Sequence, residues 1–82
     1  VEEQHPIPIA DVYIPAKRRR TLDAARVEEL AESLMEEGVK VPIQVRKDGE
    51  RLVLVEGLHR LEAARALGEE TIPGIYVGAK RY

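Results

Sequence analysis

Two segments with helical periodicity flank a β-hairpin signal in the middle of this 82-residue chain. Residues 43–47 alternate between apolar and polar side chains, Asp48-Gly49 is typical of tight hairpin turns, and residues 51–55 are rich in Val and Leu. We therefore expect a hairpin whose second strand is buried on both faces. Because each flanking helix has an apolar side to bury, this arrangement predicts a small sheet with helices packed on it.

The first helical segment runs from about residue 22 to residue 37. Its apolar side chains follow the i, i+3, i+4, i+7, i+8 spacing of one helix face, namely Val27, Leu30, Ala31, Leu34 and Met35. Thr21 or Asp23 can cap its start, and Gly38 suits the left-handed position after a helix end. The opposite side is expected to be solvated and carries Glu28, Glu29, Glu32, Glu36 and Glu37.

A second helical segment covers residues 58–67, which are rich in strong helix formers. Gly68 follows where a residue with positive φ commonly ends a helix. One face is apolar and is expected to pack on the sheet, with Leu58, Leu61, Ala64 and Leu67 along it.

Two further segments are expected to be strands. Residues 7–14 alternate loosely and contain prolines, so we expect one short edge strand there. Residues 71–77 are expected to form a closing strand, in which Pro73 and Gly74 suggest an edge or a bulge. The predicted fold is therefore α/β (α+β), a small mixed β-sheet with helices packed on it in the order β-α-β-β-α-β.

The chain contains no Cys, Phe or Trp, so its core must be aliphatic. The lack of Cys excludes a disulfide framework, a thiolate metal site and a cysteine nucleophile, and no other metal-ligand spacing occurs. A chain of this length forms one core, so we expect a single domain over residues 1–82 with its core at about 7–77. No apolar run approaches the ~20 residues of a membrane span, and the first residues lack signal-peptide features, so the cytoplasm is the expected compartment.

The first candidate site is the point where a buried strand runs through Glu56-Gly57 directly into a helix that opens with His59 and Arg60. A helix N-terminus concentrates unpaired N–H groups and positive potential, and an arginine in its first turn adds charge-assisted hydrogen bonds to an anion. Gly57 would let the backbone approach such a ligand closely. Two roles stay open for Glu56, a helix cap or a general base, and His59 is either structural or catalytic.

The second candidate site is a basic block that covers residues 17–20, just before Thr21 at the start of the first helix, with Arg26 one turn inside that helix. Residues 17–26 hold five cations and one anion, a local charge of +4 in a chain of net charge −2. Cations at a helix N-terminus oppose the macrodipole, so local stability does not explain them. A polyphosphate that bridges the two helix starts would explain both sites, whereas a solvated basic loop is the alternative.

The order of these segments resembles that of the superfamily formed by ParB N-terminal domains and sulfiredoxins, over about residues 7–77. The resemblance rests on Arg19-Arg20-Thr21-Leu22-Asp23, Val27 to Leu34, Gly38, Val41-Pro42-Ile43-Gln44-Val45, Val55 to Ala64 and Thr71-Ile72-Pro73. It implies a module that binds a nucleoside triphosphate or diphosphate with Mg²⁺. The residues that would contact phosphate are Lys17, Arg19, Arg20, Thr21, Arg26, Gly57, Leu58, His59 and Arg60.

The loop at residues 57–60 differs from each branch of that superfamily. Partition proteins have Gly-Glu-Arg-Arg, of which Gly57 and Arg60 match. Sulfiredoxins have a cysteine where this chain has Leu58, so reduction of sulfinic acids is excluded. The phosphate-binding lysine of the family's first helix corresponds to Arg26. Free-serine kinases have a His-His-Arg loop and need a catalytic acid near the first basic segment, which residues 17–20 do not supply.

The leading hypothesis is a ParB-like module that binds ATP or CTP, acts in DNA partition or regulation, and slowly hydrolyses the triphosphate. One alternative is phosphotransfer to a small hydroxyl compound, with Glu56 or His59 as the base. Another is nonspecific DNA binding or nicking, which would depend strongly on salt. A protein partner or a homodimer paired through an edge hairpin is also compatible with the sequence.

Overall fold

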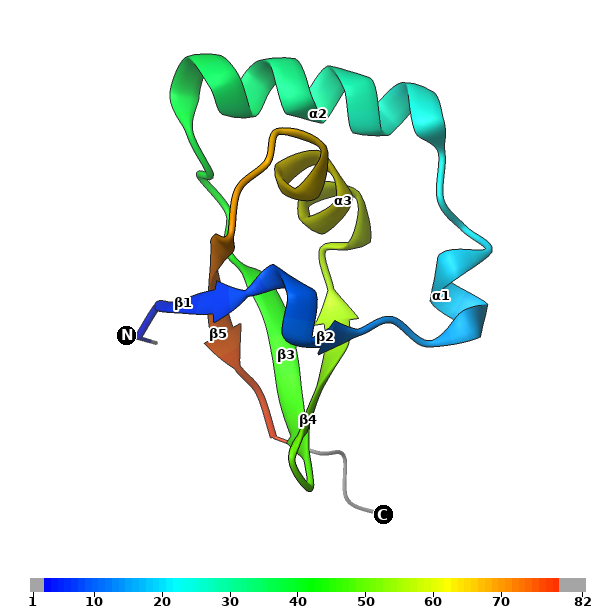
Figure 1. Cartoon of the computed structure of the whole chain (residues 1–82), viewed down its shortest axis with the longest axis vertical. Coiled ribbons are helices and arrows are strands. Elements are labelled where there is room, and N and C mark those ends of the chain that lie inside the picture. Colours follow the sequence, from blue (N-terminus) through cyan, green and yellow to red (C-terminus); the bar gives the residue numbers. More distant parts are fainter. Residues whose placement is uncertain (1–2, 79–82) are drawn as a thin grey trace.

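Five strands form one mixed sheet with the order β1-β5-β3-β4-β2, with α2 and α3 together at one end of it and α1 beyond β2 (Figure 1). The computed structural model describes residues 3–78. The elements are β1 (His5–Pro8), the 3-10 turn η1 (Ile9–Asp11), β2 (Val12–Tyr13), α1 (Ala16–Arg19), α2 (Ala24–Glu37), β3 (Ile43–Asp48), β4 (Arg51–Glu56), α3 (Leu58–Ala66) and β5 (Thr71–Tyr76). This confirms the predicted class of a small mixed sheet with packed helices.

The predicted hairpin is present as β3 and β4, which pair antiparallel. The prediction that its second strand is buried on both faces holds only for the centre of β4, where the neighbours Val53 and Leu54 are both buried. The prediction of an edge hairpin is wrong, because β3 lies between β4 and β5, and β4 pairs on its other side with the edge strand β2 at Leu52 and Val53.

The prediction of one strand over residues 7–14 is also wrong. β1 pairs with β5, β2 pairs with β4, and the turn η1 between them carries the chain from one edge of the sheet to the other. In η1 the N–H of Ile9 donates to the carbonyl of Glu70 at 3.0 Å. Buried apolar side chains occur both before and after this turn. The apolar alternation in the sequence is therefore the same as that of one continuous strand, although the chain forms two.

The closing strand β5 lies inside the sheet rather than at an edge, since it pairs with both β1 and β3. Its Pro73 faces Pro6 in the register with β1. A Cβ at Gly74 would lie 2.6 Å from Cγ1 of Ile7 and 3.0 Å from Cγ1 of Ile43. Gly74 is thus explained by close packing of the core and not by a bulge or an edge.

The helix α3 lies between α2 and the sheet (Figure 1). Among the helices, it contributes most of the side chains that are buried in the core. Its buried side chains are Leu58, Leu61, Ala63 and Ala64. The outer helix α2 has no buried residue and rests on α3 through half-buried side chains. Met35, which the periodicity placed on the packed face, is 73% exposed because α2 forms the outermost layer. The five glutamates of the opposite side are exposed as predicted.

Local hydrogen bonds set the ends of α2. The side chain of Asp23, rather than that of Thr21, caps the helix by accepting from the N–H of Ala25 at 3.0 Å. The C-cap is Gly38 with φ 75°. No helix within residues 3–78 is both long and apolar enough to cross a membrane.

An anion pocket at the start of α3

Gly57 makes the abrupt change from β4 to α3 possible. It is the N-cap of α3 with φ 104°, a left-handed conformation that favours glycine. A Cβ at this position would lie 2.7 Å from Cγ2 of Ile43, so the residue also has no room for a side chain. No side chain caps α3, which excludes the predicted capping role of Glu56. The first residues of α3, whose N–H groups have no side-chain cap, line an open pocket.

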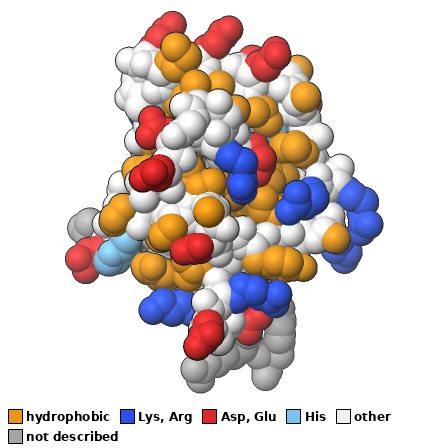
Figure 2. All heavy atoms as spheres, in the orientation of Figure 1, with side chains coloured by type: hydrophobic (Ala, Val, Ile, Leu, Met, Phe, Trp, Pro, Cys, Tyr) orange, Lys and Arg blue, Asp and Glu red, His pale blue; other side chains and the backbone are white. Residues whose placement is uncertain are grey.

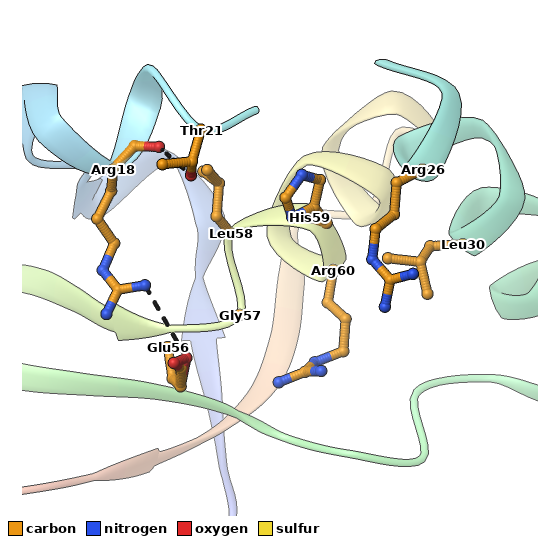
Figure 3. Close-up of a pocket in the computed structure, with 9 residues that line it drawn as sticks. All are labelled: Arg18, Thr21, Arg26, Leu30, Glu56, Gly57, Leu58, His59 and Arg60. Carbon is orange, nitrogen blue, oxygen red and sulfur yellow. Dashed lines mark hydrogen bonds and ion pairs between the residues drawn. The ribbon is translucent and has the colours of Figure 1, made fainter. Parts of the chain in front are cut away.

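The pocket has a volume of about 220 Å³ and lies between the start of α3, the α1 segment and the start of α2. Figure 3 shows its lining residues, with Arg18 on one side of the turn at Gly57 and Arg26 on the other. The lining consists of Arg18, Thr21, Arg26, Leu30, Glu56, Gly57, Leu58, His59 and Arg60. The two candidate sites found in the sequence are far apart along the chain, and they meet in this one cavity.

The basic block is divided by the structure. It forms the short helix α1, whose side chains point in different directions, and only Arg18 lines the pocket. Lys17, Arg19 and Arg20, predicted to contact phosphate, are exposed and lie outside the lining. Blue side chains gather in Figure 2 on the side where Figure 1 places α1. Arg18 was absent from the predicted phosphate contacts. Because residues 17–20 are all Lys or Arg, the sequence does not distinguish Arg18 from its neighbours.

Arg60 is the clearest sign of a ligand in the pocket. Its Nε is buried and has no hydrogen-bond partner, and its terminal Nη2 donates only a long hydrogen bond of 3.5 Å to the carbonyl of Pro42. Leaving a buried donor without a partner costs about 1–3 kcal/mol, and more when the group is charged. Arg60 also lines the pocket, and arginine binds carboxylates and phosphates through two parallel N–H groups, so its guanidinium suits an anion there.

The remaining charges of the pocket are only weakly compensated. Nη1 of Arg18 lies 3.9 Å from Oε2 of Glu56, and both side chains are about half exposed, so this ion pair contributes little. Thr21 donates its hydroxyl to the carbonyl of Arg18 at 2.7 Å, which ties it to α1. Glu56 is the carboxylate of the lining, against three arginines there. The pocket is net positive and therefore suited to an anion.

His59 has a specific partner outside its own helix. Its Nε2 accepts a hydrogen bond from the backbone N–H of Asp23 at 3.0 Å. The side chain of Leu58, by contrast, is buried in the core, so only its backbone can serve the pocket. Among residues 3–78, no three His, Asp or Glu side chains gather where they could hold a metal ion.

A sequence model of the ParB N-terminal domain matches residues 1–80. The chain belongs to the ParB N-terminal domain family. It is 37% identical over 75 residues to the nucleoid occlusion protein of Halalkalibacterium halodurans, and the match covers 90% of this chain and 26% of that protein. The chain therefore spans about a quarter of the length of this relative.

Two solved structures resemble this ParB N-terminal domain. Sulfiredoxin from Arabidopsis thaliana superposes with a TM-score of 0.83 at 30% identity, over 94% of this chain and 86% of the plant protein. The chromosome-partitioning protein ParB of Caulobacter crescentus, C-terminally truncated and complexed with CTP-γ-S, superposes with a TM-score of 0.81 at 29% identity, over 95% of this chain and 46% of that one. Both confirm the predicted ParB/sulfiredoxin-like fold, and the chain is a ParB-like module related to partition and nucleoid occlusion proteins.

Proposed function

We propose that the pocket binds the phosphates of a nucleoside triphosphate or diphosphate, ATP or CTP, and that the module acts through this ligand in DNA partition or its regulation. The observation that carries the proposal is the convergence of Arg18, Arg26 and Arg60 on one pocket that is built on a helix N-terminus. The CTP-γ-S complex of the Caulobacter relative supports the same ligand class.

Each part of the pocket has a distinct task in this proposal. The N–H groups of Leu58, His59 and Arg60 and the guanidinium of Arg60 would hold the phosphate nearest to α3. Arg18 and Arg26 would approach from the two sides that Figure 3 shows and neutralise the remaining phosphates. Hydrolysis of the triphosphate is proposed as a slow side activity of this binding.

The pocket suits a nucleotide that brings its own Mg²⁺. Glu56 is the carboxylate of the lining, and Mg²⁺ prefers an octahedron of six oxygen ligands. The ion would therefore depend on phosphate oxygens and water, with Glu56 as its protein ligand. The charge of the ion would also reduce repulsion between Glu56 and the phosphates.

Thermal denaturation of the purified chain with ATP, CTP, GTP and ADP, with and without Mg²⁺ and at two salt concentrations, tests the proposal. A ligand at ~100 times its dissociation constant should stabilise the folded chain by about 2.7 kcal/mol, a shift of several degrees for a domain of this size. A shift with ATP or CTP supports the proposal and identifies the base. The absence of a shift with every nucleotide, confirmed by calorimetric titration, would refute it.

The division of the basic block gives a paired prediction. Arg18 lines the pocket, whereas its neighbour Arg19 does not. Arg18→Ala should therefore weaken nucleotide binding about tenfold. Arg19→Ala should leave nucleotide binding unchanged but reduce salt-dependent binding of DNA, for which the exposed side of α1 is available. Calorimetric titration and DNA filter binding measure the two effects. Equal losses of nucleotide affinity in both variants would contradict the assignment of Arg18.

A second candidate function is phosphotransfer to a small hydroxyl compound, favoured by the presence of the Glu56 carboxylate in an otherwise basic pocket. Glu56 would accept the proton of the attacking hydroxyl. In this case, Glu56→Gln should abolish product formation from nucleotide and acceptor, while the stabilisation that nucleotide gives without Mg²⁺ persists. Unchanged turnover in Glu56→Gln, or no turnover of the wild-type chain with any hydroxyl acceptor, would remove this candidate.

A further inference from the structure

The backbone N–H of Asp23 donates to Nε2 of His59 at 3.0 Å, across 36 positions of the sequence. Asp23 is the N-cap of α2, and His59 lies in the first turn of α3. The bond therefore connects the starts of two helices that both line the pocket. We propose that His59 is a positioning residue that fixes the start of α2, and with it Arg26, over the phosphate site. This inference rests on the proposed function.

The hydrogen bond determines the state of the imidazole. A ring nitrogen that accepts from an N–H cannot carry a proton itself, so this bond requires the tautomer with its proton on Nδ1. The lone pair of Nε2 is already used. His59 is thus neither a free base at Nε2 nor a phosphate donor there, and its contact with α2 gives it a specific structural role at the pocket.

The packing of α2 explains why a single hydrogen bond has a large effect on position. No residue of α2 is buried, and the helix rests on α3 through half-buried side chains such as Leu30 and Leu34. The position of α2 therefore depends on contacts at its surface, and the bond at Asp23 is one that fixes its start. Arg26 lies one turn after Asp23, so the bond at Asp23 sets where the guanidinium of Arg26 enters the pocket.

Substitutions of His59 test the proposal by rescue. Gln places a side-chain oxygen near the position of Nε2 and can accept from the Asp23 N–H, whereas Ala cannot. The probe is the triphosphate that stabilises the chain in thermal denaturation. We expect His59→Ala to weaken its binding roughly five- to tenfold, which is the effect of losing one hydrogen bond. We expect His59→Gln to restore most of the lost affinity. Equal losses in both variants would overturn the proposal.

A double-mutant cycle tests whether His59 acts through Arg26. If it does, His59→Ala should cause less than about a twofold further loss in an Arg26→Ala chain, because the group being positioned is absent. Independent effects, with the losses of the two single variants multiplied in the double variant, would show that His59 contacts the ligand by itself and would overturn its positioning role.

Two measurements without nucleotide separate this inference from the proposed function. Imidazole nitrogen NMR of the free chain should show the neutral Nδ1–H tautomer for His59, and the amide of Asp23 should exchange faster in His59→Ala than in the wild-type chain. The Nε2–H tautomer or unchanged exchange would overturn the inference even where nucleotide binds. If no nucleotide binds, the proposed function fails, while these readouts still decide whether His59 holds α2.

Discussion

Arg60→Met is expected to abolish the thermal stabilisation that a nucleoside triphosphate gives the wild-type chain, while the free chain keeps or gains stability. Burial of the Arg60 Nε without a partner costs folding free energy in the absence of ligand. Methionine keeps the apolar stem and removes this cost. Loss of charge-assisted bonds to phosphate should raise the dissociation constant by about 10–100-fold, equivalent to ~1.5–3 kcal/mol. Thermal denaturation with and without nucleotide measures both effects.

Arg65→Met provides the matched control on the same helix. Arg65 is exposed and pairs with Glu62 at 3.3 Å on a different side of α3, outside the anion pocket. This variant should keep the full shift with nucleotide, and its own stability should change by less than about 1 kcal/mol. If Arg60→Met keeps the shift as well, Arg60 is not part of the binding site. If both variants lose it, general charge rather than the pocket governs binding.

The strand-to-helix site was predictable because its signal is local. A β-rich run, a glycine and a helix-forming run with an early arginine are contiguous in residues 51–67, and the structure places them as predicted. The separation of Arg18 from Lys17, Arg19 and Arg20 was not predictable. It depends on the direction in which a four-residue helix presents each side chain, and the sequence of the block is nearly uniform.

The errors in the sheet have a common physical origin. Apolar alternation reports that a side chain enters the core, but not which strand lies beside it. Ile7 and Val12 both enter the core although they belong to strands at opposite edges. Ile7 and Ile43 leave no room for a side chain at Gly74, and both are distant from it in the sequence. The same limit applies to the bond between His59 and Asp23, which no local pattern could indicate.

Gly57→Ala is expected to destabilise the chain by about 2–5 kcal/mol, more than either Gly68→Ala or Gly74→Ala. Two costs combine at this position: a left-handed φ of 104°, and a Cβ that would lie 2.7 Å from Cγ2 and 3.0 Å from Cβ of Ile43. The first costs ~1–2 kcal/mol and the second ~1–3 kcal/mol. Ile43 is fully buried and cannot move away cheaply. Urea denaturation measures the free energy of unfolding.

The other two glycines separate the costs that Gly57 combines. Gly68 has φ 79°, and a Cβ there would meet nothing within 4 Å, so Gly68→Ala should show the conformational cost alone, about 1 kcal/mol. Gly74 has no positive φ but a Cβ there would lie 2.6 Å from Ile7, so Gly74→Ala should show the packing cost alone, about 1–3 kcal/mol. A loss at Gly57 no larger than that at Gly68 would mean that Ile43 yields. The close approach of Ile43 to Gly57 would then not be what excludes a side chain from this turn.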